Sequence, residues 1–227
     1  AILAVASVLC WVWEIDKGPD NGPVDIGGGI TLPVYMTGPS AHGWWAMIVL
    51  MIVGGSIYLA YLFSYLYLWT VSPGVWESGG AMLPHSWRPV ATAALFIGAA
   101  AAFHFAIKSL KPKNSRSLLT PALILGGAIL AISGIGLELS GHWEAGLRPT
   151  QSSYGAMVYM ASFLSGQLVI AITIMAGFVI ARHFAGMLDD QRFAGLENTT
   201  LLVYYTVGQA LLGLLVVHGF PHMIGAA

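Results

Sequence analysis

Long stretches without a charged side chain dominate this sequence. Five of them run over residues 26–76, 90–107, 117–137, 149–181 and 198–227. Each approaches or exceeds the roughly 20 apolar residues that a helix needs to cross a bilayer. Membrane-barrel strands have about ten residues of alternating polarity, whereas these stretches are longer and apolar throughout. The pattern therefore predicts membrane-spanning helices.

We predict an all-α, polytopic transmembrane bundle of about six helices. Their expected ranges are 1–13, 44–69, 90–107, 119–139, 154–181 and 201–217. The first is short and lacks an initiator Met and a basic flank, which indicates a cut helix of a longer chain rather than a signal peptide. A loop rich in Gly and Pro follows it. We therefore divide the chain into 1–41, a preceding helix with its loop, and 42–227, a five-helix membrane domain.

Small residues gather in several predicted helices, as in Gly54, Gly55 and Ser56. Further small residues lie at 98–102 and at Gly126, Gly127, Gly134 and Gly136. In lipid, helices associate through close van der Waals contact, which small residues permit. We expect these positions to form packing seams, and we expect the 54–56 patch to dock a partner.

Composition and charge support a membrane location and limit the partners. Charged residues make up 8% of the chain, against about 25% in a soluble domain. The net charge of -1, without a dense basic run, excludes nucleic acid as a partner. Alternating connections place seven of the nine Lys and Arg on one side, which predicts that this side is cytoplasmic. Those seven are Lys17, Lys108, Lys111, Lys113, Arg116, Arg182 and Arg192.

The histidines do not form an evident haem or metal site in the sequence. We place His104 and His218 within helices but at opposite membrane depths, whereas two axial haem ligands must meet at one depth. His218 and His222 have the i, i+4 spacing of a two-point metal site. Pro221 disfavours helix between them, and no Cys or carboxylate lies nearby in sequence. The lone Cys10 can form neither an internal disulfide nor a thiolate cluster. We expect no metal ligand.

Glu138 is the one carboxylate inside a predicted helix. An acid within the membrane suggests function by default. Ser140, Gly141 and His142 follow it at the predicted helix end, where it can reach water or His142, so we favour a structural or lipid-headgroup role over a proton relay. The sequence shows no nucleophile–base pair, phosphate-binding Gly loop or redox dithiol. We therefore predict no catalytic and no cofactor-binding residues in this chain.

Several segments resemble subunit III of haem-copper cytochrome c oxidases. His-Gly-Trp-Trp-Ala-Met at 42–47 and Phe-Ser-Tyr-Leu-Tyr-Leu-Trp-Thr-Val-Ser-Pro at 63–73 are similar to the start of its five-helix core. The version fused behind subunit I in some bacterial oxidases is the most similar. The similarity continues through Ala-Phe-His at 102–104, Trp-Glu-Ala at 143–145 and Tyr-Gly at 154–155, and covers His42 to about Val217.

The chain departs from that family at ionisable positions. Gly55 falls where the family has a carboxylate in the first core helix. The family's His-Gly-x-His motif corresponds to Ser-Gly-Gln-Leu at 165–168, and its last-helix Trp-His and Asp fall near Tyr204, Tyr205 and Gly208. The resemblance therefore implies the family's packing role but not the roles of those ionisable groups.

The resemblance implies a non-redox, multi-pass domain of an oxygen-reducing, proton-pumping oxidase in the bacterial inner membrane. Such a domain packs on subunit I, contacts other oxidase subunits and phospholipid, and supports proton uptake and enzyme lifetime. Haem and copper would lie in a partner subunit or in missing chain. The candidate lipid or subunit-packing residues are Trp44, Trp45, Gly54, Gly55, Tyr65, His104, Glu138, Glu144 and Gly166.

Two other classes stay open at this point. A polytopic transporter would need polar groups converging near the middle of the membrane, and apart from Gln167 and Gln209 the helices offer few. A membrane anchor binding haem b or quinone is disfavoured by the depths of the histidines.

Overall fold

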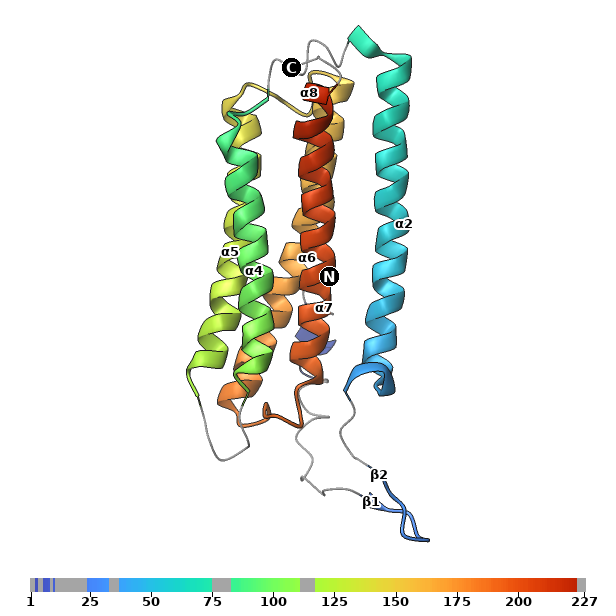
Figure 1. Cartoon of the computed structure of the whole chain (residues 1–227), viewed down its shortest axis with the longest axis vertical. Helices are drawn as coiled ribbons and strands as arrows, with labels where there is room; N and C mark the ends of the chain where they lie inside the picture. Colours follow the sequence, from blue (N-terminus) through green and yellow to red (C-terminus); the bar gives the residue numbers. More distant parts are fainter. Residues whose placement is uncertain are drawn as a thin grey trace.

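Long helices make up almost all of the structure (Figure 1). The computed structural model describes residues 3, 6–8, 10, 24–32, 37–74, 83–110 and 117–223. Within these ranges, five helices are long and apolar enough to cross a membrane. They are α2 (His42–Val71), α4 (Trp87–Lys108), α5 (Leu119–Glu144), α6 (Ser153–Phe184) and α7 (Ala194–Leu214). The chain is a multi-pass membrane protein, and the all-α prediction is confirmed.

The sixth predicted helix, 1–13, falls mostly on residues outside the described ranges. The predicted loop after it contains a short hairpin of β1 (Val24–Asp25) and β2 (Thr31–Leu32). The turn between these strands has positive φ at the three glycines 27–29, a backbone conformation that residues with a Cβ rarely adopt. A three-residue 3₁₀ turn, η1 (Gly38–Ser40), then leads into α2.

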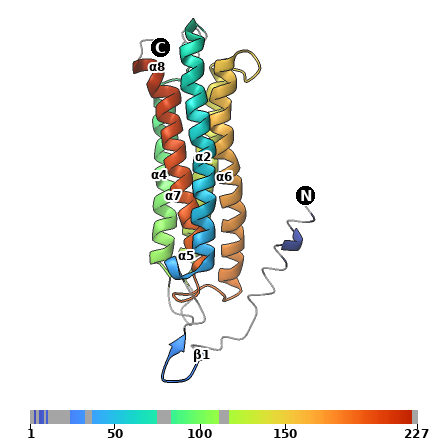
Figure 2. The ribbon, with the colours of Figure 1, turned by 90° about the vertical axis from the view of Figure 1, so that its right-hand side faces the viewer.

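Four of the helices form a bundle, and α2 stands beside it (Figure 1) and in front of it in the view turned by 90° (Figure 2). α4 packs alongside α5, α6 packs on α5, and α7 closes the bundle against α4 and α6. α2 contacts this bundle mainly through α7. Consecutive helices run in opposite directions (Figure 1). One end of the bundle therefore holds Lys108, and the other holds Glu144; we call them the Lys108 end and the Glu144 end.

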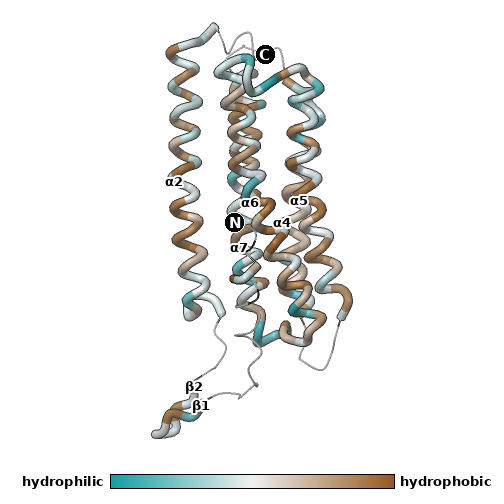
Figure 3. Tube along the Cα trace, turned by 180° about the vertical axis from the view of Figure 1, so that it is seen from behind, coloured by the Kyte–Doolittle hydropathy of each residue, from teal (hydrophilic) through white to brown (hydrophobic). Residues whose placement is uncertain are grey.

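Hydrophobic side chains cover the outside of the helices as well as the inside. Figure 3 shows hydrophobic positions continuing along the helices, and Ile52, Phe63, Leu125 and Ile170 are all exposed. A helix at the surface of a soluble protein keeps a polar face toward water. Lipid is the solvent that fits this outer surface.

Helices α4 and α5 meet where small residues were expected to form a seam. A Cβ on Gly127 would lie 2.7 Å from the Phe103 ring, and one on Gly134 would lie 3.1 Å from the Phe96 ring. Phenyl rings thus occupy the space that these glycines leave. The packing-seam prediction is confirmed at both positions, whereas Gly126 and Gly136 have no such neighbour within 4 Å.

Helix α7 begins seven residues before the predicted start at 201, because polar residues there are compatible with a buried helix. Thr199 and Thr200 are buried, and their hydroxyls donate to the backbone carbonyls of Gly195 and Leu196. Bonding one turn back along the helix satisfies each hydroxyl without solvent. The predicted boundary was wrong because it treated these polar residues as a loop.

Asp189 holds the connection between α6 and α7 in a compact turn. Its carboxylate accepts hydrogen bonds of 2.7–3.0 Å from the backbone N–H groups of Gln191 and Arg192 and from the Arg192 guanidinium. Burial acts to raise the pKa of Asp189, but these hydrogen bonds outweigh it, so the pKa lies below its ordinary value. The carboxylate therefore stays charged at neutral pH and fixes this turn at the Lys108 end.

Candidate functional site

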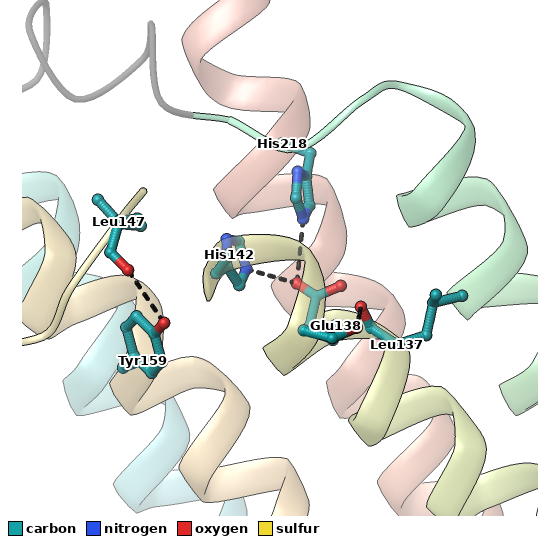
Figure 4. A network of polar contacts seen from close by, with 7 residues as sticks. Leu137, Glu138, His142, Leu147, Tyr159 and His218 are labelled. Carbon is teal, nitrogen blue, oxygen red and sulfur yellow. Dashed lines mark hydrogen bonds and ion pairs between the residues drawn. The ribbon is translucent and has the colours of Figure 1, made fainter. Parts of the chain in front are cut away.

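A carboxylate and two histidines meet inside the bundle near the Glu144 end (Figure 4). Glu138 and His142 lie one turn apart on α5, and His218 follows α7. The Glu138 Oε1 atom is 3.0 Å from the His142 Nε2 atom and 3.0 Å from the His218 Nε2 atom. All three residues are buried, with 9%, 0% and 7% of their surfaces exposed. We call this group the Glu–His–His cluster.

Helix α5 brings the first two members together because it runs five residues past the predicted end at 139. His142 is therefore helical, and the i, i+4 spacing places it on the same face as Glu138. The contact between Glu138 and His142 that the sequence suggested is present. Glu138 points into the bundle rather than toward lipid headgroups (Figure 4).

His218 reaches the cluster through a π-helical turn, η2 (Leu215–Gly219). The Phe220 N–H donates to the Leu215 carbonyl, five residues back. The helical path then continues as α8 (Phe220–Met223), which contains Pro221. The prediction that Pro221 disfavours helix between His218 and His222 was wrong, because the wider turn changes the hydrogen-bond register just before the residue that lacks an N–H. Single π turns occur frequently at functional sites.

No carboxylate lies near His218 along the chain, but the fold brings one to it. Glu138 is 80 residues away in sequence and in direct contact in space. The partner considered in the sequence, His222, has a side chain outside the described part of the structure. The i, i+4 spacing of Glu138 and His142 was the useful signal in the sequence. No pattern near His218 indicated that it would join them.

The two imidazoles face one carboxylate oxygen from stacked positions. Their ring centroids are 5.3 Å apart, with 10° between the ring planes. A carboxylate accepts hydrogen bonds, so each Nε2 atom can donate to it when protonated. Because a buried carboxylate needs compensation for lost hydration, the two imidazoles explain how Glu138 is tolerated here. The arrangement can hold a proton or a cation.

A small cavity lies against the cluster. It has a volume of about 20 Å³ and is lined by Glu138 together with Thr92, Ser162 and Ser165. Such a volume accommodates about one water-sized group. Thr92 is completely buried, and its hydroxyl has no hydrogen-bond partner among the described residues. This part of the bundle therefore offers a small recess beside the carboxylate, and three hydroxyl-bearing side chains are part of its lining.

Two other ionisable candidates, Glu144 and His104, lie at the surface. Glu144 forms an ion pair with Arg88 and is largely exposed. His104, on α4, is exposed, and its Nδ1 atom lies 2.8 Å from the Tyr204 hydroxyl of α7. Neither residue belongs to the Glu–His–His cluster.

Helix α2 approaches α7 along a seam of glycines and tyrosines. Tyr205 of α7 faces Gly54 and Gly55 of α2, where a Cβ on Gly54 would lie 3.1 Å from the Tyr205 hydroxyl. The second contact exchanges the two helices: a Cβ on Gly213 of α7 would lie 2.7 Å from the Tyr58 hydroxyl of α2. The 54–55 positions thus pack within this chain. Tyr205 occupies the space beside Gly54, whereas a Cβ on Gly55 would lie 3.8 Å from it, an ordinary contact. The docking of a partner on the 54–56 patch stays a prediction.

The remaining aromatic candidates lie on α2. Tyr65 is completely buried, near the buried Tyr58 and Tyr61. Trp44 and Trp45 form an edge-to-face pair at the Lys108 end, with ring centroids 5.1 Å apart. The Trp45 indole N–H donates to the Pro39 carbonyl. Tyr65 therefore packs within the chain, whereas the exposed Trp45 also faces outward.

Gly166 borders an apolar groove between α5 and α6. The groove has a volume of about 700 Å³. Among its lining residues are Ile132, Phe163, Ile170 and the more polar Gln167. Because Gly166 has no side chain, it leaves the wall of the groove open. An apolar groove on the outside of a membrane bundle suits a lipid acyl chain or a partner helix.

Comparison with known proteins adds no relative to these observations. No family model matches this chain, and the search of curated proteins found no match.

Proposed function

We propose that this chain is a non-redox, subunit III-type domain of a proton-pumping haem-copper terminal oxidase in the bacterial inner membrane. It packs on the catalytic subunit I and binds phospholipid. In this role it supports proton uptake and prolongs the working life of the enzyme. Haem and copper are carried by the partner subunit or by another part of the same polypeptide.

One observation carries this proposal. The segments that resemble subunit III mark the ends of successive spans: 42–47 opens α2, and 102–104 lies in the last two turns of α4. Likewise, 143–145 closes α5, and 154–155 opens α6. These segments occur in chain order at the ends of consecutive helices. Such an order supports a five-helix arrangement shared with subunit III more strongly than isolated similar segments would.

The outer surface is consistent with an accessory membrane domain. Helix α2 is mostly unburied, with 11% of its most apolar stretch inside the structure, and its exposed side is apolar. The groove between α5 and α6 offers a second apolar surface. Lipid or a neighbouring membrane protein must cover both surfaces, as expected for a domain beside a catalytic subunit.

A transporter fits these features less well. Substrate sites of transporters lie near the middle of the membrane, between broken helices. The Glu–His–His cluster instead lies near the Glu144 end, with Glu138 less than two turns from the end of α5.

We expect removal of this domain to shorten the life of the oxidase without abolishing its chemistry. The complex would be purified with and without the domain, and oxygen consumption followed through sustained turnover. We predict similar initial rates and a faster loss of activity in the depleted enzyme, because the redox centres lie outside this chain. An immediate loss of all activity in an assembled, haem-loaded depleted enzyme would contradict the non-redox role. Identical lifetimes would contradict the supporting role.

A further inference from the structure

The Glu–His–His cluster has the geometry of a three-ligand metal site. The Glu138 Oε1, His142 Nε2 and His218 Nε2 atoms all lie within 4.8 Å of one another. Zinc bonds of about 2.1 Å in a tetrahedral site place neighbouring ligand atoms about 3.4 Å apart. The observed 3.0 Å separations between oxygen and nitrogen are close to this value. We propose that these three residues bind a divalent transition-metal ion, with Zn²⁺ the best match.

The types of ligand atom favour zinc over harder cations. Calcium takes six to eight oxygen ligands, and magnesium demands octahedral oxygen coordination. Two imidazole nitrogens and one carboxylate oxygen instead form a common zinc set, which leaves a fourth position for water. Each histidine would carry its proton on Nδ1 and present the Nε2 lone pair to the metal.

Charge also favours a cation at this place. Metal binding requires both imidazoles to be neutral, and the carboxylate then leaves one negative charge inside an apolar bundle. Intramembrane acids are costly unless they are paired. A divalent ion compensates this charge, and a bound hydroxide would bring the whole site to neutrality. Arg88 lies beside Gly141 of α5, and its guanidinium is already paired with Glu144.

The small cavity supplies an independent indication of a further bound group. Thr92 lines it and is completely buried, and its hydroxyl finds no partner among the described residues. Buried polar atoms normally have a hydrogen-bond partner. A water molecule held in this volume of about 20 Å³ beside Glu138 could accept a hydrogen bond from the Thr92 hydroxyl. The unpartnered hydroxyl thus points to a further small group next to the cluster.

The fold holds the three ligand residues in position before a metal arrives. Glu138 and His142 are fixed by successive turns of α5, and the π-helical turn that follows α7 aims His218 at them (Figure 4). Preorganised ligands lose little freedom on binding. The inference depends on this local geometry and not on the proposed oxidase role.

The test uses the complete membrane complex that contains this chain, purified in detergent and exposed to Zn²⁺. Bound zinc would be counted by elemental mass spectrometry after dialysis, and its ligands identified by zinc X-ray absorption. We expect about one zinc more per complex in wild type than in Glu138→Gln, His142→Gln or His218→Gln. We also expect imidazole ligands in the absorption spectrum, and at least about tenfold weaker zinc binding in each variant.

His183→Gln is the matched control, because His183 is also buried but lies at the far end of α6. It should retain the wild-type zinc content. Equal zinc in wild type and in the three cluster variants would overturn the proposal and leave a cluster that holds only protons. A wild-type zinc spectrum without imidazole ligands would overturn it as well, even if the variants fail to fold.

Discussion

Gly155→Ala should destabilise the protein more than any other single methyl group added to α6. A Cβ at this position would lie 2.3 Å from the Arg148 carbonyl oxygen, and a backbone atom cannot swing aside as a side-chain end can. The Gly155 N–H also donates to the Ser152 hydroxyl that caps α6. Moving the loop away would break this cap. We expect a loss of about 2–4 kcal/mol, from overpacking together with cap disruption.

The measurement is thermal unfolding in detergent, compared with Gly177→Ala. Gly177 lies in the same helix, and a Cβ there would meet nothing within 4 Å. Alanine favours helix over glycine by up to about 1 kcal/mol, so Gly177→Ala should leave stability unchanged or slightly higher. Equal effects of the two substitutions would show that the 148–155 contact is absent.

Gly213→Ala should loosen α2 from α7, and Tyr58→Phe should reverse the effect. The added Cβ would lie 2.7 Å from the Tyr58 hydroxyl oxygen but 4.0 Å from the ring carbon that bears it. Tyr58 is buried and packed beside Tyr61, so its ring has little room to move. Overpacking of this kind costs about 1–3 kcal/mol. Removing the hydroxyl removes the clash and leaves an ordinary contact.

A double-mutant cycle in the same unfolding assay measures this coupling. Tyr58→Phe alone should have little effect, because the buried hydroxyl has no hydrogen-bond partner among the described residues. Combined with Gly213→Ala, it should recover about 1–2 kcal/mol. Tyr67→Phe is the control, since Tyr67 is an exposed tyrosine on α2. The assigned seam between α2 and α7 would be contradicted if Tyr67→Phe restored the stability of Gly213→Ala as much as Tyr58→Phe does. It would also be contradicted if Tyr58→Phe did not restore that stability.

The spans could be predicted from sequence because charge and hydropathy decide whether a segment enters lipid. Their ends were harder to predict, because local hydrogen bonding decides them. Thr199 and Thr200 look like loop residues, yet their hydroxyls bond within α7. At the end of α5, His142 looks interfacial, yet it is completely buried and its Nε2 atom contacts Glu138.

The candidate site was only partly accessible from sequence. Glu138 and His142 share a helix face, so their spacing was a usable signal. His218 comes from another helix and depends on a π-helical turn that no local pattern indicated. The same limit applies to Gly54, whose space is filled by Tyr205 from a segment far along the chain. Contacts of this kind follow from how helices pack rather than from the pattern of one segment.

Isolation of the intact complex through an affinity tag on this chain tests the proposed function most directly. Mass spectrometry of the purified membrane complex would identify the attached proteins, and an absorption spectrum would report haem. We expect a haem-copper catalytic subunit to be present in equal amount, either as a separate protein or as part of the same polypeptide. A stable, correctly folded complex that contains no haem-copper subunit would contradict the assignment to a terminal oxidase.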